Sequence, residues 1–150
     1  EAQALVTKAN AFGMARRRCL GYDFNRFSLL LAILEKRIKI SLSGEDVFFN
    51  IAGGVKVTDP AADLGAAIAV ISSFRDQEMS LSTLYIGEVG LSGELRPVSN
   101  IGLRLKEAQR IGVKRCFIPE SNLNDLSEPV EFTVESAATL KEVVEQVFAG

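Results

Sequence analysis

Apolar residues recur three and four positions apart in four stretches of the chain, which is the spacing of one helix face. Asp23 or Asn25 can cap the first helix, and Asp59-Pro60 is a start signal for the second. Ser99 or Asn100 can cap the third. The four predicted helices span residues 23–37, 59–75, 99–112 and 137–148.

Runs rich in β-branched and aromatic residues alternate with these helices. A turn at Asn10 to Gly13 would join the first two strands as a hairpin, and Gly87 to Gly93 would join the fourth and fifth. The interleaving predicts one sheet with helices against it, in the α+β or α/β class. The predicted strands span residues 2–7, 16–20, 47–52, 83–89, 91–98, 115–118 and 131–134.

The composition is that of one ordinary globular domain. Of 150 residues, 47% are apolar and 24% charged, which is enough to bury a core without a disulfide or structural metal. No apolar run approaches the ~20 residues that cross a bilayer, so we expect a soluble protein without a membrane partner. Because the chain starts at Glu1 with a strand-like run, we expect a single domain from a longer protein.

The absence of histidine removes the commonest general base and the commonest metal ligand. Cys19 and Cys116 are far apart in sequence and lack the CxxC spacing of a zinc site. We therefore expect two buried free thiols in a reducing cytoplasm, and no cofactor in this domain.

Basic residues are concentrated in two segments, although the formal net charge is −2. Residues 1–40 hold eight Lys or Arg against three Asp or Glu, and residues 102–116 hold five against one. Residues 120–145 instead hold seven acidic residues against one Lys. If folding brings the basic segments together, they form a positive face for a polyanion. Otherwise these charges only solvate the surface.

Three segments are distinctive in combination: residues 25–37, 52–56 and 87–96, which read NRFSLLLAILEKR, AGGVK and GEVGLSGELR. In their order and spacing they resemble the C-terminal domain of the bacterial RadA (Sms) family, a domain similar to the proteolytic domain of Lon. The resemblance covers nearly the whole chain. It implies an α+β sandwich with the architecture of Lon proteolytic domains and of domain 2 of ribosomal protein S5.

Lon-type domains cleave peptides with a Ser-Lys dyad, and this chain departs from that pattern at both positions. The resemblance places the serine position at Ala61, within Asp59-Pro60-Ala61-Ala62-Asp63, and the lysine position at Gly102. Ala61 has no oxygen to attack a carbonyl, and Gly102 has no amine to accept the proton. Lys106, one helical turn along, has no serine partner to activate. The resemblance therefore implies no catalytic residues and a proteolytically inactive domain.

In the RadA family this domain follows a zinc-binding segment and a RecA-like ATPase, forms six-membered rings and contributes to DNA binding during branch migration. The resemblance thus implies DNA recombination and repair in the cytoplasm, with DNA of any sequence and further copies of the chain as partners. The sequence contains no Walker-type phosphate loop. ATP, Mg and Zn are therefore expected in the missing domains, which would make the longer protein a DNA-dependent ATPase and helicase.

Seven cations are candidate DNA phosphate contacts. Arg16, Arg17 and Arg18 alternate between the two faces of a strand, so they cannot all contact one phosphate backbone. Arg26 lies in the first turn of its helix, where the helix dipole gives a cation no stabilisation. Arg104 could instead pair with Glu107. The candidates are Arg17 and Arg26 first, followed by Arg37, Lys56, Arg104, Lys106 and Arg110.

The remaining features favour binding to the DNA backbone over base recognition. The chain has no Trp and two Tyr, and most of its Phe residues occupy predicted core positions, so duplex binding is the better hypothesis. Gly87, Gly90 and Gly93 lie between strand-like runs, which favours turns over a phosphate loop. Two alternatives remain: a purely structural oligomerisation scaffold and, less favoured, a Ser-Lys peptidase.

Overall fold

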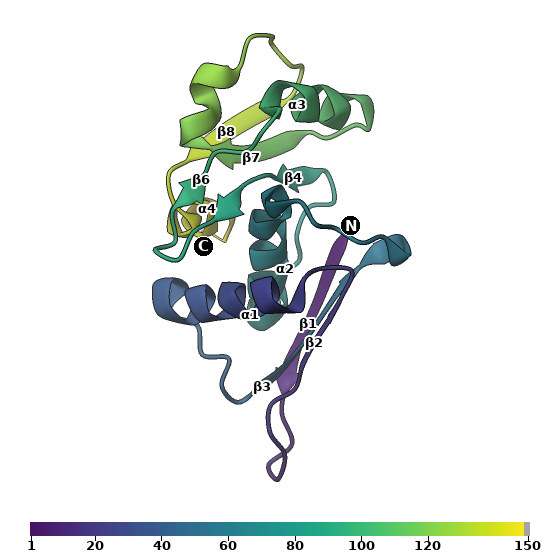
Figure 1. Cartoon of the computed structure of the whole chain (residues 1–150), viewed down its shortest axis with the longest axis vertical. Coiled ribbons are helices and arrows are strands. Elements are labelled where there is room, and N and C mark those ends of the chain that lie inside the picture. The colour runs from purple at the N-terminus through teal and green to yellow at the C-terminus, as the bar shows by residue number, and fades with distance from the viewer. Residues whose placement is uncertain (149–150) are drawn as a thin grey trace. The chain divides into compact units, whose positions relative to one another are not determined.

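The computed structural model describes residues 1–148 and confirms the mixed α+β class (Figure 1). The chain divides into two compact units. The first unit comprises residues 1–59 and 66–78, and the second comprises residues 60–65 and the described residues from 79 onward.

The sheet of the first unit has β3 at its centre. Strand β1 (Ala2–Lys8) pairs antiparallel with β3 (Glu45–Ile51), and β2 (Arg17–Leu20) pairs parallel with β3 on its other side. The predicted hairpin between the first two strands is therefore wrong. The turn itself forms, because Gly13 N–H donates to the Asn10 carbonyl at 3.1 Å. Strand β3 lies between the other two strands. Its buried side chains alternate along the strand, which suits the centre of a sheet better than an edge.

Helix α1 (Phe24–Ile33) continues as a π-helical turn, η1 (Leu34–Ile38), so the predicted helix is confirmed with a widened last turn. The Asp23 carboxylate caps it by accepting hydrogen bonds from two backbone N–H groups of the first turn. Its apolar face covers one side of the sheet, where the Phe27 ring lies 5.0 Å from that of Phe49.

The first unit also contains η2 (Ala52–Gly54) and the later part of α2 (Asp63–Arg75). Gly53 has φ of 85°, a left-handed conformation that glycine adopts without steric cost. The α2 hydroxyl of Ser73 accepts a hydrogen bond from Val6 N–H of β1 at 2.9 Å. The predicted start of this helix is off by one turn, since Pro60–Ala62 forms a separate 3₁₀ turn, η3.

The second unit contains two further sheets, so the prediction of a single sheet is wrong. Strands β4 (Thr83–Tyr85) and β8 (Thr133–Ala137) pair parallel with the central β7 (Arg115–Pro119). Strands β5 (Glu88–Val89) and β6 (Leu95–Arg96) form a small antiparallel pair. The predicted strand over residues 83–89 is interrupted because Gly87 bonds instead to Ala61 of η3 and to Leu64 in the first turn of α2.

Helices α3 (Ile101–Arg110) and α4 (Leu140–Val147) complete this unit, with η4 (Glu120–Asp125) between β7 and β8. Asn100 is the N-cap residue of α3, as one of the two predicted alternatives had it, but it has φ of 56° and its side chain makes no capping hydrogen bond. Apolar side chains of α3 pack with β7 in a buried cluster around Ile101, Leu105 and Ile118.

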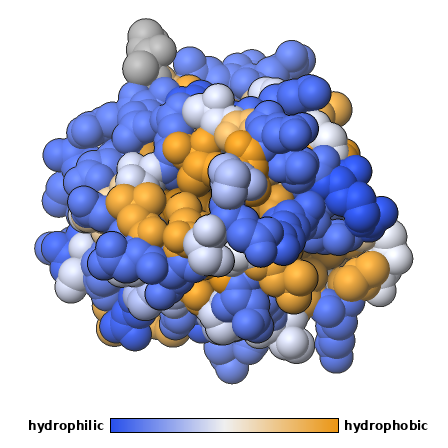
Figure 2. Space-filling model, turned by 90° about the horizontal axis from the view of Figure 1, so that it is seen from above, coloured by the Kyte–Doolittle hydropathy of each residue, from blue (hydrophilic) through white to orange (hydrophobic). Residues whose placement is uncertain are grey.

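The surface is mixed in character. On the face drawn in Figure 2, apolar residues form small groups among hydrophilic ones. Every helix within residues 1–148 is too short or too polar to traverse a lipid bilayer.

Candidate nucleic-acid interface and the positions of the expected dyad

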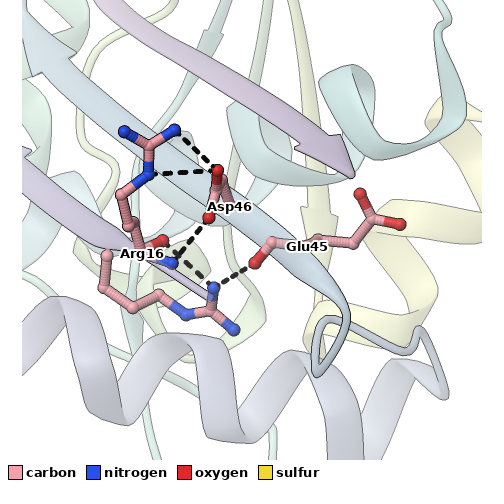
Figure 3. A network of polar contacts seen from close by, with 4 residues as sticks. Arg16, Glu45 and Asp46 are labelled. Carbon is pink, nitrogen blue, oxygen red and sulfur yellow. Dashed lines mark hydrogen bonds and ion pairs between the residues drawn. The ribbon is translucent and has the colours of Figure 1, made fainter. Parts of the chain in front are cut away.

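Arg17, a leading sequence candidate, is held by backbone carbonyls of its own unit. Its guanidinium donates to the carbonyl of Glu45 and to that of Arg16 at 3.3 Å (Figure 3). It also donates to the Leu42 carbonyl at 2.8 Å. These bonds tie β2 to the turn that precedes β3. Most of its donors are therefore engaged in the fold.

Arg16 is part of the same network. Its guanidinium and its backbone N–H all donate to the Asp46 carboxylate, which is buried (Figure 3). These hydrogen bonds, led by the one from the backbone N–H, lower the pKa of Asp46 below its ordinary value. The guanidinium also lies over the Phe48 ring, 5.4 Å from its centroid.

Arg18 is exposed like Arg16 but does not share its ion pair, and it was not among the candidates chosen from the sequence. Along β2 half-buried and exposed residues alternate, so Arg17 lies on the covered side while Arg18 and Leu20 lie on the open side. No ion pair joins Arg18 to another residue in the part of the chain that the structure describes. The alternation of side chains along the strand was predictable from the sequence. Which face is exposed to solvent depends on where α1 packs.

The remaining candidates of the first unit lie on three separate elements. Arg26 is half-buried in the first turn of α1 and has an interaction partner in the fold. Arg37 in η1 and Lys56 after η2 are exposed, and neither makes an ion pair within residues 1–148. Arg37 therefore presents its charge to solvent at the end of the α1–η1 helix.

The three candidates of the second unit, all on α3, are engaged. Lys106 pairs with Glu128 at 2.6 Å, and Arg110 holds both carboxylate oxygens of Glu107. Arg104 Nε donates to the Ser99 carbonyl at 2.8 Å, and this residue also has a further interaction partner in the fold. The Arg110 guanidinium lowers the pKa of Glu107.

Both expected dyad positions lie in the second unit. Ala61 is only 6% exposed and belongs to the buried apolar cluster that includes Ile101. Its carbonyl accepts a hydrogen bond from Gly87 N–H at 3.0 Å. A residue with a methyl side chain thus helps form the core at the position where the resemblance expects a nucleophile.

Gly102 borders a small pocket of about 180 Å³ next to α3, and a side chain added there would meet no atom within 4 Å. Lys106, Ser127 and Glu128 line the same pocket. The Lys106 amine is bound to Glu128, and no hydrogen bond to Ser127 is found among the described residues. An ammonium held by a carboxylate has no free lone pair to activate a serine.

Other residues of chemical interest have structural roles. The turn between β5 and β6 is closed by Gly93 N–H donating to the Gly90 carbonyl at 2.9 Å, which confirms turns rather than a phosphate loop there. Cys116 is buried, which raises its pKa to about 12, whereas Cys19 is half-buried, not fully buried as predicted. Within residues 1–148, no group of three or more potential ligands is placed to hold a metal ion.

Comparisons with known proteins agree with the resemblance. The family model described as subunit ChlI of Mg-chelatase matches residues 28–122. The DNA repair protein RadA of Streptococcus pneumoniae is 42% identical over 149 residues, which cover 99% of this chain and 35% of that protein. RadA of Bacillus subtilis is 43% identical over 150 residues, or 100% of this chain and 32% of that protein. The chain thus spans about a third of the length of these curated relatives.

Proposed function

The chain belongs to the family described as subunit ChlI of Mg-chelatase and is homologous to one domain of the DNA repair protein RadA, and from this premise we propose that it binds DNA. In this proposal it is a proteolytically inactive, Lon-like domain that binds the DNA backbone without sequence preference. It works within a longer recombination and repair ATPase that carries out branch migration as a hexameric ring, with ATP, Mg and Zn bound outside this chain.

The observation that carries the proposal is the set of cations without ion pairs in the first unit. Arg18, Arg37 and Lys56 are exposed, and each can approach a phosphate without first breaking a contact with an acid among the described residues. Phosphate contacts of this kind supply affinity that is independent of sequence. Arg26 remains a candidate. Arg17 is a weaker one, because its guanidinium already donates to backbone carbonyls.

A salt series tests the proposal. Binding of the chain to a labelled duplex should weaken steeply from about 50 to 200 mM salt, and each lost phosphate contact should reduce the log-log slope by about 0.9. The triple variant Arg18→Ala, Arg37→Ala, Lys56→Ala removes three cations without ion pairs. The matched control Lys106→Ala, Arg110→Ala, Lys141→Ala removes the same charge from ion-paired positions.

The two triple variants separate the hypotheses. We expect a large loss of slope in the first and a much smaller one in the control. Equal losses would mean that only the net charge matters and that these positions make no specific contacts. If the unaltered chain shows no salt-dependent binding, the scaffold alternative replaces DNA binding.

Proteolytic inactivity has its own test. Incubation with an unfolded protein substrate should give no cleavage, because Ala61 and Gly102 supply neither nucleophile nor base. Cleavage that disappears in Ser127→Ala would instead establish a peptidase in the pocket beside Lys106.

For the ring, the mass of the longer protein measured by sedimentation should equal six protomers, and a monomer would contradict that part of the proposal.

A further inference from the structure

The loop between β1 and β2 exposes two apolar side chains completely. Phe12 is 104% exposed and Met14 is 93% exposed, and the loop extends beyond the end of the strands (Figure 1). The turn from Asn10 to Gly13 closes its tip, and Ala9 N–H bonds to the Gly44 carbonyl at its base. Backbone hydrogen bonds therefore hold the loop, and packing of these two side chains does not.

Neither side chain contributes to the core of the first unit. Polar residues at positions 12 and 14 would leave the backbone turn unchanged and would remove apolar surface from water. Phe12 and Met14 lie two positions apart on one loop, and together they expose an apolar surface that a partner could cover. A partner must therefore be sought in the chemistry around the loop.

The segment around the loop is cationic. Residues 2–22 contain Lys8, Arg16, Arg17 and Arg18 and no acidic residue. Lys8 precedes the loop, and Arg16 follows it with a side chain that remains 58% exposed while it binds Asp46. The acids facing this segment are those of β3: Glu45, opposite Lys8 in register, and the buried Asp46. Arg18 has neither as an ion-pair partner, so the segment keeps a net positive charge.

An apolar tip between cationic flanks matches nucleic acid with accessible bases. The face of an unstacked base can pack against an aromatic ring, and inserted Phe and Met side chains are known to separate base steps. The thioether of Met14 is flexible and adapts to irregular contacts. The flanking cations attract the phosphates on either side of such a base.

We propose that the 9–15 loop is a base-contacting wedge, in which Phe12 and Met14 pack against an unstacked base of DNA while Arg18 and Lys8 contact adjacent phosphates. This inference rests on the proposed DNA binding and adds to it a preference for unpaired or opened DNA. It changes the expectation of backbone-only binding, since Phe12 is not a core residue.

The test compares the full 150-residue chain with two variants on a labelled single-stranded oligothymidine and on a paired duplex of the same length. The first variant is Phe12→Ala, Met14→Ala. The matched control is Leu81→Ala, which removes a 92% exposed apolar side chain from the second unit. Because all three side chains are exposed, the variants should fold, and circular dichroism checks this.

We expect the loop variant to lose about tenfold in single-strand affinity, because it removes the stacking of a base on Phe12. Its salt slope should stay unchanged, because no phosphate contact is removed. Duplex affinity and the Leu81→Ala control should change far less. Phe12→Trp, which keeps an aromatic ring, should retain the affinity.

The following results would each contradict the proposal that the loop contacts a base. If the chain binds DNA with a steep salt slope but the loop variant binds single strands equally well, the wedge is wrong and the proposed function stands. If no salt-dependent DNA binding occurs, both are wrong. A loop variant that alters only the oligomeric mass, or only the binding to vesicles of anionic lipid, would assign the loop to a second copy or to a membrane surface instead.

Discussion

The two units differ in how many of their cations are ion-paired. The first unit has ten basic against eight acidic residues, and the second has seven basic against eleven acidic. In the second unit, Lys106, Arg110, Arg115 and Lys141 all pair with carboxylates, whereas in the first unit Arg18, Arg37 and Lys56 pair with none in the part of the chain from 1 to 148. The number of basic residues in a segment is therefore a poor guide to its affinity for DNA. A cation that is already ion-paired must leave its carboxylate before it can bind a phosphate.

The units also differ in whether they contain the positions at which a Lon-type protease would have its catalytic dyad. The second unit contains both expected dyad positions, and at Ala61 the apolar core continues where a nucleophile would stand. The first unit has an aromatic core around Phe27 and Phe49 and an open sheet face on its other side. If the second unit preserves the framework of a hydrolase, the first carries the surface that the proposed function uses.

The largest effect is expected from Phe27→Ala, which tests whether the units are independently stable. Phe27 is fully buried, so the change should destabilise the first unit by ~3–5 kcal/mol. Thiol labelling in urea reports on both units, because Cys19 lies in the first and Cys116 in the second. We expect the Cys19 midpoint to fall more than that of Cys116. Equal shifts would show one cooperative transition and would weaken the comparison.

A smaller effect is expected from Asn122→Ala in the second unit. The buried Asn122 amide accepts from Val98 N–H at 2.9 Å and donates to the Val98 carbonyl at 3.0 Å. Its loss leaves both groups without a partner, which should destabilise the protein by about 2 kcal/mol. Urea denaturation measures this. The exposed neighbour provides the control, since Ser121→Ala should leave the midpoint unchanged.

Acid should affect the two units through differently placed carboxylates. The pKa of Asp46 is lowered in the folded state, so its contribution to stability is complete above the ordinary value of about 3.9 and is lost as pH falls below it. Asp46→Asn should therefore flatten the dependence of the unfolding free energy on pH between neutrality and strong acid. Glu107→Gln, at an exposed pair, should flatten it less. The reverse order would contradict the structural role given to the Arg16 network.

The smallest effect on stability is expected from Glu128→Gln, which would make the second unit resemble the first. Removing this exposed partner of Lys106 should change the unfolding free energy by less than ~1 kcal/mol. If pairing is what keeps Lys106 from DNA, the salt slope for duplex binding should become steeper, by up to about 0.9. An unchanged slope would mean that α3 lies away from the DNA altogether.

Much of the local structure was predictable because it depends on neighbours in sequence. The Asp23 cap, the buried stripe of α1 and the inward positions of α3 all follow from residues three or four apart. The errors arose where distant segments compete. Gly87 bonds to Ala61 instead of continuing a strand, and β3 separates two strands that a turn had suggested were partners.

The same division holds for the candidate site. The sequence alone determined that positions 61 and 102 carry no nucleophile or amine, because side-chain chemistry is independent of folding. It also determined that the first forty residues are basic. Only the tertiary structure decided which cations are available: α1 covers one face of β2, which commits Arg17 to carbonyls and leaves Arg18 in solvent. Burial and pairing are long-range properties, since they depend on which surfaces meet after the chain has folded.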